Sequence, residues 1–215
     1  MTTLAHEINQ PLNALSMHLF MAKKGLPEQD NDTSLMAINK SEQLVARMDG
    51  IVRSLRQFAR KRDDNEQLQP VNLRQSIQSA WDVLKLQHKT RKVILSYPDI
   101  LPKVLGDEIG IQQVLVNLLS NALDASPTEA EITVDYSETA DKLLLTLCDN
   151  GTGWPLHLAD TLMKPFTTSK EIGLGVGLSI SQSIMQQIGG ELRIASTLRG
   201  NGCVILEFKK VLEDA

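Results

Sequence analysis

The chain has 215 residues, of which 42% are hydrophobic and 22% are charged, and its formal net charge is -4. This composition is typical of a soluble globular protein with one large domain or two small ones, and the acidic balance argues against nucleic acid as the main partner. Because no signal peptide and no apolar run long enough to span a bilayer are found, we expect a cytoplasmic fragment without membrane contact, although the full-length protein could be membrane-anchored.

Two amphipathic helices are predicted at the N-terminus. Apolar side chains recur at steps of three and four over residues 4–24 and again over residues 35–59. A break from Gly25 to Asp32 separates them, and Asp32 could cap the second helix. The pattern predicts an antiparallel hairpin with too little core for a stable monomer, which a second copy would complete as a four-helix bundle. On this segment alone, a coiled-coil spacer without chemistry is the simpler interpretation.

A polar segment follows the hairpin, and the pattern then changes. We expect a hairpin domain at 1–62, a linker at 63–72 and a second domain at 73–215. In the second domain helices are predicted at 73–87, 107–126 and 179–188, and strands at 93–97, 132–136, 143–148, 192–195 and 204–208. Since these elements lack regular βαβ alternation, we expect an α+β fold, with an α/β sandwich whose helices cover one face of a mixed sheet. Cys148 and Cys203 lie in strand-like runs and are expected to be reduced core thiols.

A histidine followed by an acid lies near the start of the first helix. Leu4 and Ile8 belong to the apolar stripe, so the His6 side chain should face outward, where a neutral imidazole is a fair nucleophile near pH 7. A carboxylate at Glu7 could fix its tautomer, and Pro11 should kink the helix. Taken alone, the pair is more often an ordinary surface histidine beside a glutamate. Because this helix opens so close to the first residue, we expect a fragment of a longer protein.

Two asparagines, Asn117 and Asn121, lie four residues apart on a helix whose other face is apolar, so they point the same way. An amide oxygen can ligate Mg²⁺ without adding charge that repels phosphates, and the NH₂ group can donate to them. Two asparagines in a leucine-rich helix cost helix propensity, which indicates a function, with a buried polar bond as the alternative.

Two glycine-containing loops complete the candidate site. The run Asp149 to Gly153 follows a strand, where its carboxylate could accept from the exocyclic amine of adenine, although Asp-Asn-Gly is also an ordinary tight turn. The run Gly173 to Leu178 precedes a helix and could lend N–H groups to phosphates. Its spacing is neither the dinucleotide fingerprint nor a Walker loop. Residues 163–170 between the two runs are expected to form a mobile lid, with a plain surface loop as the alternative.

Five ordered motifs resemble the transmitter region of sensor histidine kinases, the input half of bacterial two-component systems. Residues 4–12 resemble the family's H box, 113–125 its N box, 149–153 its G1 box, 165–170 its F box and 173–178 its G2 box. The ending of the H box and the Asn-Ala-Leu-Asp-Ala stretch are most similar to the subgroup of C4-dicarboxylate sensors. The resemblance implies a helical dimerisation hairpin followed by a Bergerat-type ATP-binding domain.

The resemblance also implies a role for each matching residue. His6 would accept the γ-phosphoryl group of ATP with the help of Glu7, and an aspartate of a response-regulator receiver domain would then receive it. Asn121 would ligate Mg²⁺, Asn117 would lie beside it on the phosphates, and Asp149 would bind adenine. The remaining residues expected in the nucleotide site are Gly151, Gly153, Thr168, Lys170, Gly173, Gly175, Gly177 and Leu178. The protein would act as a homodimer.

The chain departs from the family pattern in three places. No basic residue follows Asp107 within the next three positions, Gln10 stands where many relatives carry Thr or Asn, and the third glycine patch, Gly200 to Cys203, matches only approximately. Two other functions remain open. An ATPase clamp of the gyrase type would release free phosphate without forming a phosphoprotein, and a dimeric scaffold with a degenerate site would not bind ATP.

Overall fold

The computed structural model of the chain describes residues 13–22, 34–41, 44–45, 68–86, 88, 91–154, 161–164 and 175–211. The chain divides into two compact units, Met1–Lys61 and Arg62–Ala215. Over the described ranges, no helix is both long enough and apolar enough to cross a membrane.

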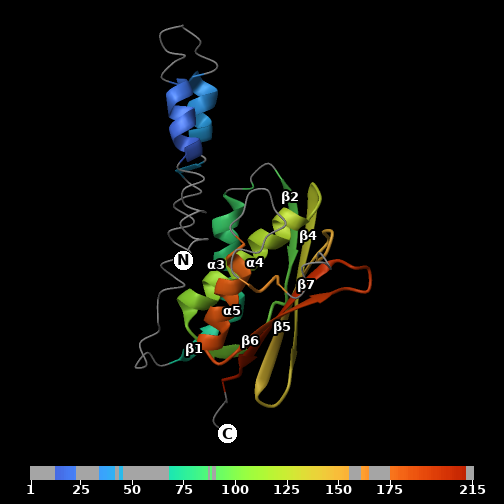
Figure 1. Ribbon diagram of the computed structural model, residues 1–215. Helices are drawn as coiled ribbons and strands as arrows, with labels where there is room; N and C mark the ends of the chain where they lie inside the picture. The colour runs from blue at the N-terminus through green and yellow to red at the C-terminus, as the bar shows by residue number, and fades with distance from the viewer. Residues whose placement is uncertain are drawn as a thin grey trace. The chain divides into compact units, whose positions relative to one another are not determined.

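In the first unit, residues 13–22 and 34–41 are helical and lie side by side (Figure 1). The buried positions between them carry small residues, namely Ala22, Ser34, Ala37 and Ser41. The Ser34 hydroxyl donates to the carbonyl of Ala22 at 3.3 Å, which ties the start of the second helix to the end of the first. Eight large apolar side chains among the described residues of this unit are exposed instead, and these are Met17, Leu19, Phe20, Met21, Leu35, Met36, Ile38 and Val45. Four residues of the predicted apolar stripes are therefore left exposed within a single chain, namely Leu19, Leu35, Ile38 and Val45.

The second unit contains a five-stranded mixed sheet covered on one face by helices (Figure 1). The strands, in sheet order, are β2 (Lys92–Ser96), β4 (Glu129–Glu138), β5 (Lys142–Asp149), β7 (Gly202–Lys209) and β6 (Glu191–Ser196). β2 runs parallel to β4, and the other pairs are antiparallel. The helices are α3 (Leu73–Lys85), α4 (Glu108–Ala125) and α5 (Gly177–Gln187). The predicted sandwich, its three helices and these five strands are confirmed.

The core follows from alternation in the strands and an apolar face on the central helix. On β4 the buried side chains are Ala130, Ile132 and Val134, every second residue, as expected when one face of a sheet is covered. On α4 the buried apolar side chains are Ile111, Val114, Leu115, Leu118, Leu119, Ala122 and Leu123. This spacing leaves Asn117 and Asn121 beside the buried face rather than within it.

A second, two-stranded sheet was not predicted from the sequence. β1 (Gln69–Asn72) pairs antiparallel with β3 (Lys103–Gly106). β1 lies in the segment expected to be a linker, and of its four side chains only Val71 is buried. A strand this short with one inward residue gives no alternation that a sequence pattern could detect.

Both ends of α4 are held by polar contacts. The Asp107 carboxylate caps the N-terminus by accepting from the backbone N–H groups of Ile109 and Gly110. At the other end, the Arg91 guanidinium donates to the carbonyl of Leu123 at 2.6 Å and to that of Ser126 at 2.6 Å. A cation at this end also complements the helix dipole. The helix that carries the asparagine pair is therefore fixed at both termini.

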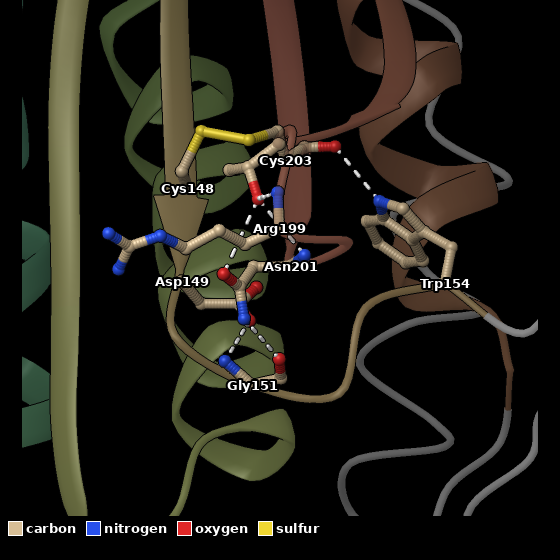
Figure 2. The surroundings of a disulfide bond; sticks show 8 residues. Cys148, Asp149, Gly151, Trp154, Arg199, Asn201 and Cys203 are labelled. Atoms are coloured by element: carbon tan, nitrogen blue, oxygen red, sulfur yellow. Dashed lines mark hydrogen bonds between the residues drawn. A yellow bond between two sulfur atoms is a disulfide. The ribbon is translucent and has the colours of Figure 1, made fainter.

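The two cysteines form a disulfide, so the prediction of reduced thiols is wrong for this structure. Cys148 on β5 and Cys203 on β7 are direct partners in the antiparallel ladder, and their Cα atoms are 4.1 Å apart (Figure 2). The two residues are 55 positions apart in sequence, and only the pairing of β5 with β7 brings them together. The bond lies one residue before Asp149, at the edge of the candidate site.

Candidate functional site

The asparagine pair of α4 lies against the first turn of α5. The Asn117 Nδ2 atom is 3.5 Å from the Gly177 carbonyl oxygen and 3.4 Å from the Ser181 hydroxyl. A Cβ atom built on Gly177 would lie 3.9 Å from Asn121 Nδ2 and 4.0 Å from Asn117 Cγ. Both asparagines are half-buried. Two polar amides therefore face the start of a helix from one side, as the spacing in the sequence predicted.

The start of α5 is suited to bind an anion. The helix begins at Gly177, and the residue before it, Val176, supplies no side-chain cap. Its first N–H groups therefore lack the side-chain oxygen that usually satisfies them, and a phosphate could take that role. Gly175 has a φ of 62°, a left-handed conformation that favours glycine. Leu178 is half-buried and packs on the core, so it anchors this turn.

A half-buried carboxylate stands at the end of β5. Asp149 Oδ1 accepts a hydrogen bond from the Gly151 N–H at 2.8 Å. Burial raises the pKa of Asp149 from its ordinary value, and the Gly151 hydrogen bond opposes this shift in part. A Cβ atom at Gly202 would lie 3.0 Å from Asp149 Oδ2, so the absence of a side chain there leaves room for the carboxylate. The group is an oriented acceptor in a partly water-excluded position, suited to an exocyclic amine.

The loop after Asp149 is fixed by its neighbours. Asn150 uses its side chain to donate to the Glu129 carbonyl at 3.1 Å and to accept from the Glu131 N–H at 3.0 Å, which anchors the loop to the start of β4. A side chain at Gly151 would strike the carbonyl of Ala125 at the end of α4. Only glycine therefore lets the loop approach this helix so closely.

Three sequence motifs meet along α4. Its asparagines face the start of α5, and its C-terminal end touches the loop after β5. The structure thereby gathers the predicted site residues Asn117, Asn121, Asp149, Gly151, Gly153, Gly175, Gly177 and Leu178 in the second unit. The other predicted residues, His6, Glu7, Thr168, Lys170 and Gly173, lie outside the described residues, as does most of the expected lid.

The β6–β7 turn adds contacts that the sequence did not reveal. Asn201 Nδ2 donates to the Gly151 carbonyl at 2.7 Å, and Trp154 Nε1 donates to the Cys203 carbonyl at 3.0 Å (Figure 2). Gly153 has a φ of 76°, and its missing side chain lets it pack against the carbonyl of Gly200. The only signal in the sequence was the approximate glycine patch at 200–203.

The donors near the start of α5 fit a magnesium nucleotide better than a protein-only metal site. Across the described residues, no group of three His, Cys, Asp or Glu side chains is placed to hold a metal ion. The amide of Asn121 is a neutral oxygen donor of the kind that Mg²⁺ accepts, and Mg²⁺ often takes its other ligands from substrate phosphates. The residues present are therefore compatible with Mg²⁺ bound together with a triphosphate.

Two family models match the chain. The His Kinase A (phospho-acceptor) domain matches residues 1–64, and the histidine kinase-, DNA gyrase B-, and HSP90-like ATPase matches residues 106–212. The first match spans the first unit, and the second match lies within the second unit.

Curated relatives match over nearly all of the chain. Identity is 51% over 208 residues to the phosphoglycerate transport system sensor protein PgtB of Salmonella typhimurium, covering 97% of this chain and 31% of that protein. Identity is 34% over 197 residues to the C4-dicarboxylate transport sensor protein DctB of Rhizobium meliloti, covering 90% and 31%. The chain thus spans about a third of the length of these relatives.

Solved structures share the fold. The histidine kinase AdeS of Acinetobacter baumannii aligns with a TM-score of 0.72 at 18% identity, covering 95% of this chain and 98% of that one. The histidine kinase ThkA, solved in complex with the response regulator protein TrrA, aligns with a TM-score of 0.69 at 20% identity, covering 98% and 60%. At such identities the likeness shows the fold alone. By its two family models and its sequence relatives, however, the chain belongs to the sensor histidine kinases, which are ATP-dependent protein-histidine kinases.

Proposed function

We propose that this chain transfers the γ-phosphoryl group of ATP to His6 and then passes it to an aspartate of a response-regulator receiver domain. The observation that carries the proposal is the meeting of three motifs along α4, which places an oriented carboxylate, two amides and an uncapped helix start in one domain. The complex of the relative ThkA with its response regulator supports the second transfer.

Each part of the nucleotide would have its own partner. Asp149 would accept from the adenine amine, and the first turn of α5 with Gly175 would receive the phosphates. Asn121 would hold Mg²⁺, with Asn117 beside it, and the ion when bound would offset the negative charge of the phosphates. The protein then contributes mainly position and charge neutralisation, because phosphoryl transfer needs little covalent chemistry from the enzyme.

The phosphate acceptor would be His6, with Glu7 as its helper. The match of the phospho-acceptor domain to residues 1–64 supports this assignment, because it contains both residues. The neutral imidazole would attack the γ-phosphorus, and the leaving group would be ADP. Thr168 and Lys170, from the segment between the two glycine runs, would complete the nucleotide site together with Gly173, the first residue of the second run.

A homodimer is the proposed active form. Among the described residues of the first unit, eight large apolar side chains are exposed in the single chain, including Phe20 at 67% and Met36 at 62%. A soluble helix pair gains by covering such a surface, and a second copy would complete a four-helix bundle. We further propose that this piece works as the cytoplasmic part of a longer sensor, since its relatives named as sensors are about three times its length.

The decisive test is the site of phosphorylation. His6→Gln should abolish labelling from γ-labelled Mg-ATP while leaving the Kd for ATP nearly unchanged, because residue 6 is not expected to bind the nucleotide. Labelling is measured on gels after alkaline and acid treatment, and ATP binding by calorimetry. An acid-labile phosphoprotein in the variant would exclude His6, and release of free phosphate without labelling of the wild type would indicate an ATPase instead.

The metal assignment has its own test. Asn121→Asp should weaken Mg-ATP binding by about tenfold, because an added negative charge beside the phosphates and an altered metal ligand oppose binding. Gln186→Glu is the matched control, because it adds the same charge at an exposed side chain in the last turn of α5, away from the start of that helix. Identical calorimetric titrations of wild type and Asn121→Asp would remove Asn121 from the metal site.

A further inference from the structure

Gly151 fixes the loop after β5 through contacts on three sides. Its N–H donates to Asp149 Oδ1 at 2.8 Å, and its α-carbon packs against the end of α4 at Ala125. Its carbonyl accepts from Asn201 Nδ2 at 2.7 Å (Figure 2). Because Gly151 is buried, bulk water would not readily replace Asn201 as the hydrogen-bond partner of this carbonyl if the Asn201 side chain were removed.

The amide of Asn201 is itself fixed by the β6–β7 turn. Its backbone N–H donates to Thr197 Oγ1 at 3.0 Å, and its carbonyl accepts from the Thr197 N–H at 2.9 Å. The Thr197 hydroxyl donates to Asn201 Oδ1 at 3.3 Å. Since Oδ1 is taken as an acceptor and only the NH₂ group can donate to a carbonyl, Nδ2 must be the atom that faces Gly151.

We propose that Asn201 is a positioning residue for adenine recognition. The Asn201 side chain donates to the Gly151 carbonyl, and the N–H of Gly151 orients the Asp149 carboxylate. The inference rests on the proposed function, because it takes Asp149 as the group that binds adenine. Asn201 need not touch the nucleotide in this arrangement; it acts through Gly151 on Asp149.

A second contact also joins the β6–β7 turn to the loop after β5. Gly153 has a φ of 76° and packs against the Gly200 carbonyl, one residue before Asn201. Of these two contacts, only the Asn201 hydrogen bond is made by a side chain. A substitution at Asn201 therefore removes one contact of the loop and leaves the Gly153–Gly200 contact in place.

Two substitutions test the role of the Asn201 donor in the full chain. Asn201→Ala removes the amide, whereas Asn201→Asp keeps its shape and its acceptor for the Thr197 hydroxyl but cannot donate. Both should raise the KM for Mg-ATP in autophosphorylation by roughly five- to tenfold, the scale of one hydrogen bond, and leave the rate at saturating Mg-ATP unchanged. Competition by inorganic tripolyphosphate should be unaffected, because it carries no base.

A control and a stability measurement separate positioning from general loosening. Leu198→Ala lies in the same turn at a fully exposed side chain, so its KM should equal that of the wild type. If both Asn201 variants keep a KM within about twofold of wild type, or if they weaken Mg-ATP and tripolyphosphate alike together with a lower Tm, the positioning role is refuted. A wild-type chain that binds no Mg-ATP would refute the proposed function first and this inference with it.

Discussion

Asp149, the proposed acceptor for the adenine amine, carries a cost in stability. Burial raises its pKa, and the Gly151 hydrogen bond only partly opposes the shift. The Asp149 carboxyl group therefore stays protonated to a higher pH in the folded state than in the unfolded chain. The contribution of the protonated carboxyl group to stability is fully present below the pKa of the unfolded state, and it is lost as the pH rises through the raised pKa of the folded state. At neutral pH the ionised carboxylate thus lowers stability, which is typical of groups that are kept for binding.

Asp149→Asn should separate these two effects. Losing a charge-assisted hydrogen bond of about 1.5–3 kcal/mol should weaken Mg-ATP binding by roughly 10- to 100-fold. The nucleotide-free variant should unfold at a higher temperature than wild type at pH 7. This difference should shrink as the pH falls through the raised pKa of the folded state and should be gone below the ordinary range of an aspartate. Calorimetry and thermal unfolding over a pH series measure both effects. Unchanged ATP affinity would exclude Asp149 from base recognition, and a pH-independent difference in Tm would contradict the raised pKa.

The sequence predicted those helices and strands whose apolar pattern is local. The central helix and the five long strands carry several apolar residues each, so their periodicity survives in one dimension. β1 and β3 have four residues each, and their pairing is a tertiary event. Asp149 and the asparagine pair could be found because each lies in a motif of neighbouring residues. Asn201 and the Cys148–Cys203 bond could not, because each depends on how β7 meets distant segments.

The disulfide makes a measurable contribution at this scale. In the chain-entropy account, a bond that closes a loop of 55 residues stabilises the folded state by about 4 kcal/mol. Reduction by a small dithiol should therefore lower the denaturant midpoint of the second unit. A Cys148→Ser, Cys203→Ser double variant is the matched control and should not respond to the reductant. Equal midpoints for oxidised and reduced wild type would show that the bond adds no stability.

At the scale of the whole molecule, the two units differ in how they bury apolar surface. The second unit has its own core of fully buried aliphatic residues from α3, α4 and the sheet. The described helices of the first unit bury only small residues and expose most of the large apolar ones. The first unit is thus expected to depend on a second copy, whereas the second unit can fold on its own.

Phe20→Ser should weaken the dimer. A buried phenylalanine contributes roughly 2–3 kcal/mol and occurs once in each copy, so the dimer Kd should rise by more than about 100-fold. Ile100→Ser is the control, because Ile100 is 80% exposed and lies in the second unit. Sedimentation velocity over a concentration series measures the change. A dimer unaffected by Phe20→Ser would mean that this side chain is not in the interface.

β3 contacts segments from both the beginning and the end of the described part of the second unit. Its backbone pairs with β1 on one side, and on the other Val104 bridges to Lys210 while the Val211 N–H donates to Lys103. β1 and residues 210–211, which come from the first and last described segments of the second unit, therefore lie on opposite flanks of a single short strand. A short peptide could join these two segments, and new ends could be opened at the exposed tip between β4 and β5. The second unit is thus suited to circular permutation, or to insertion within another protein.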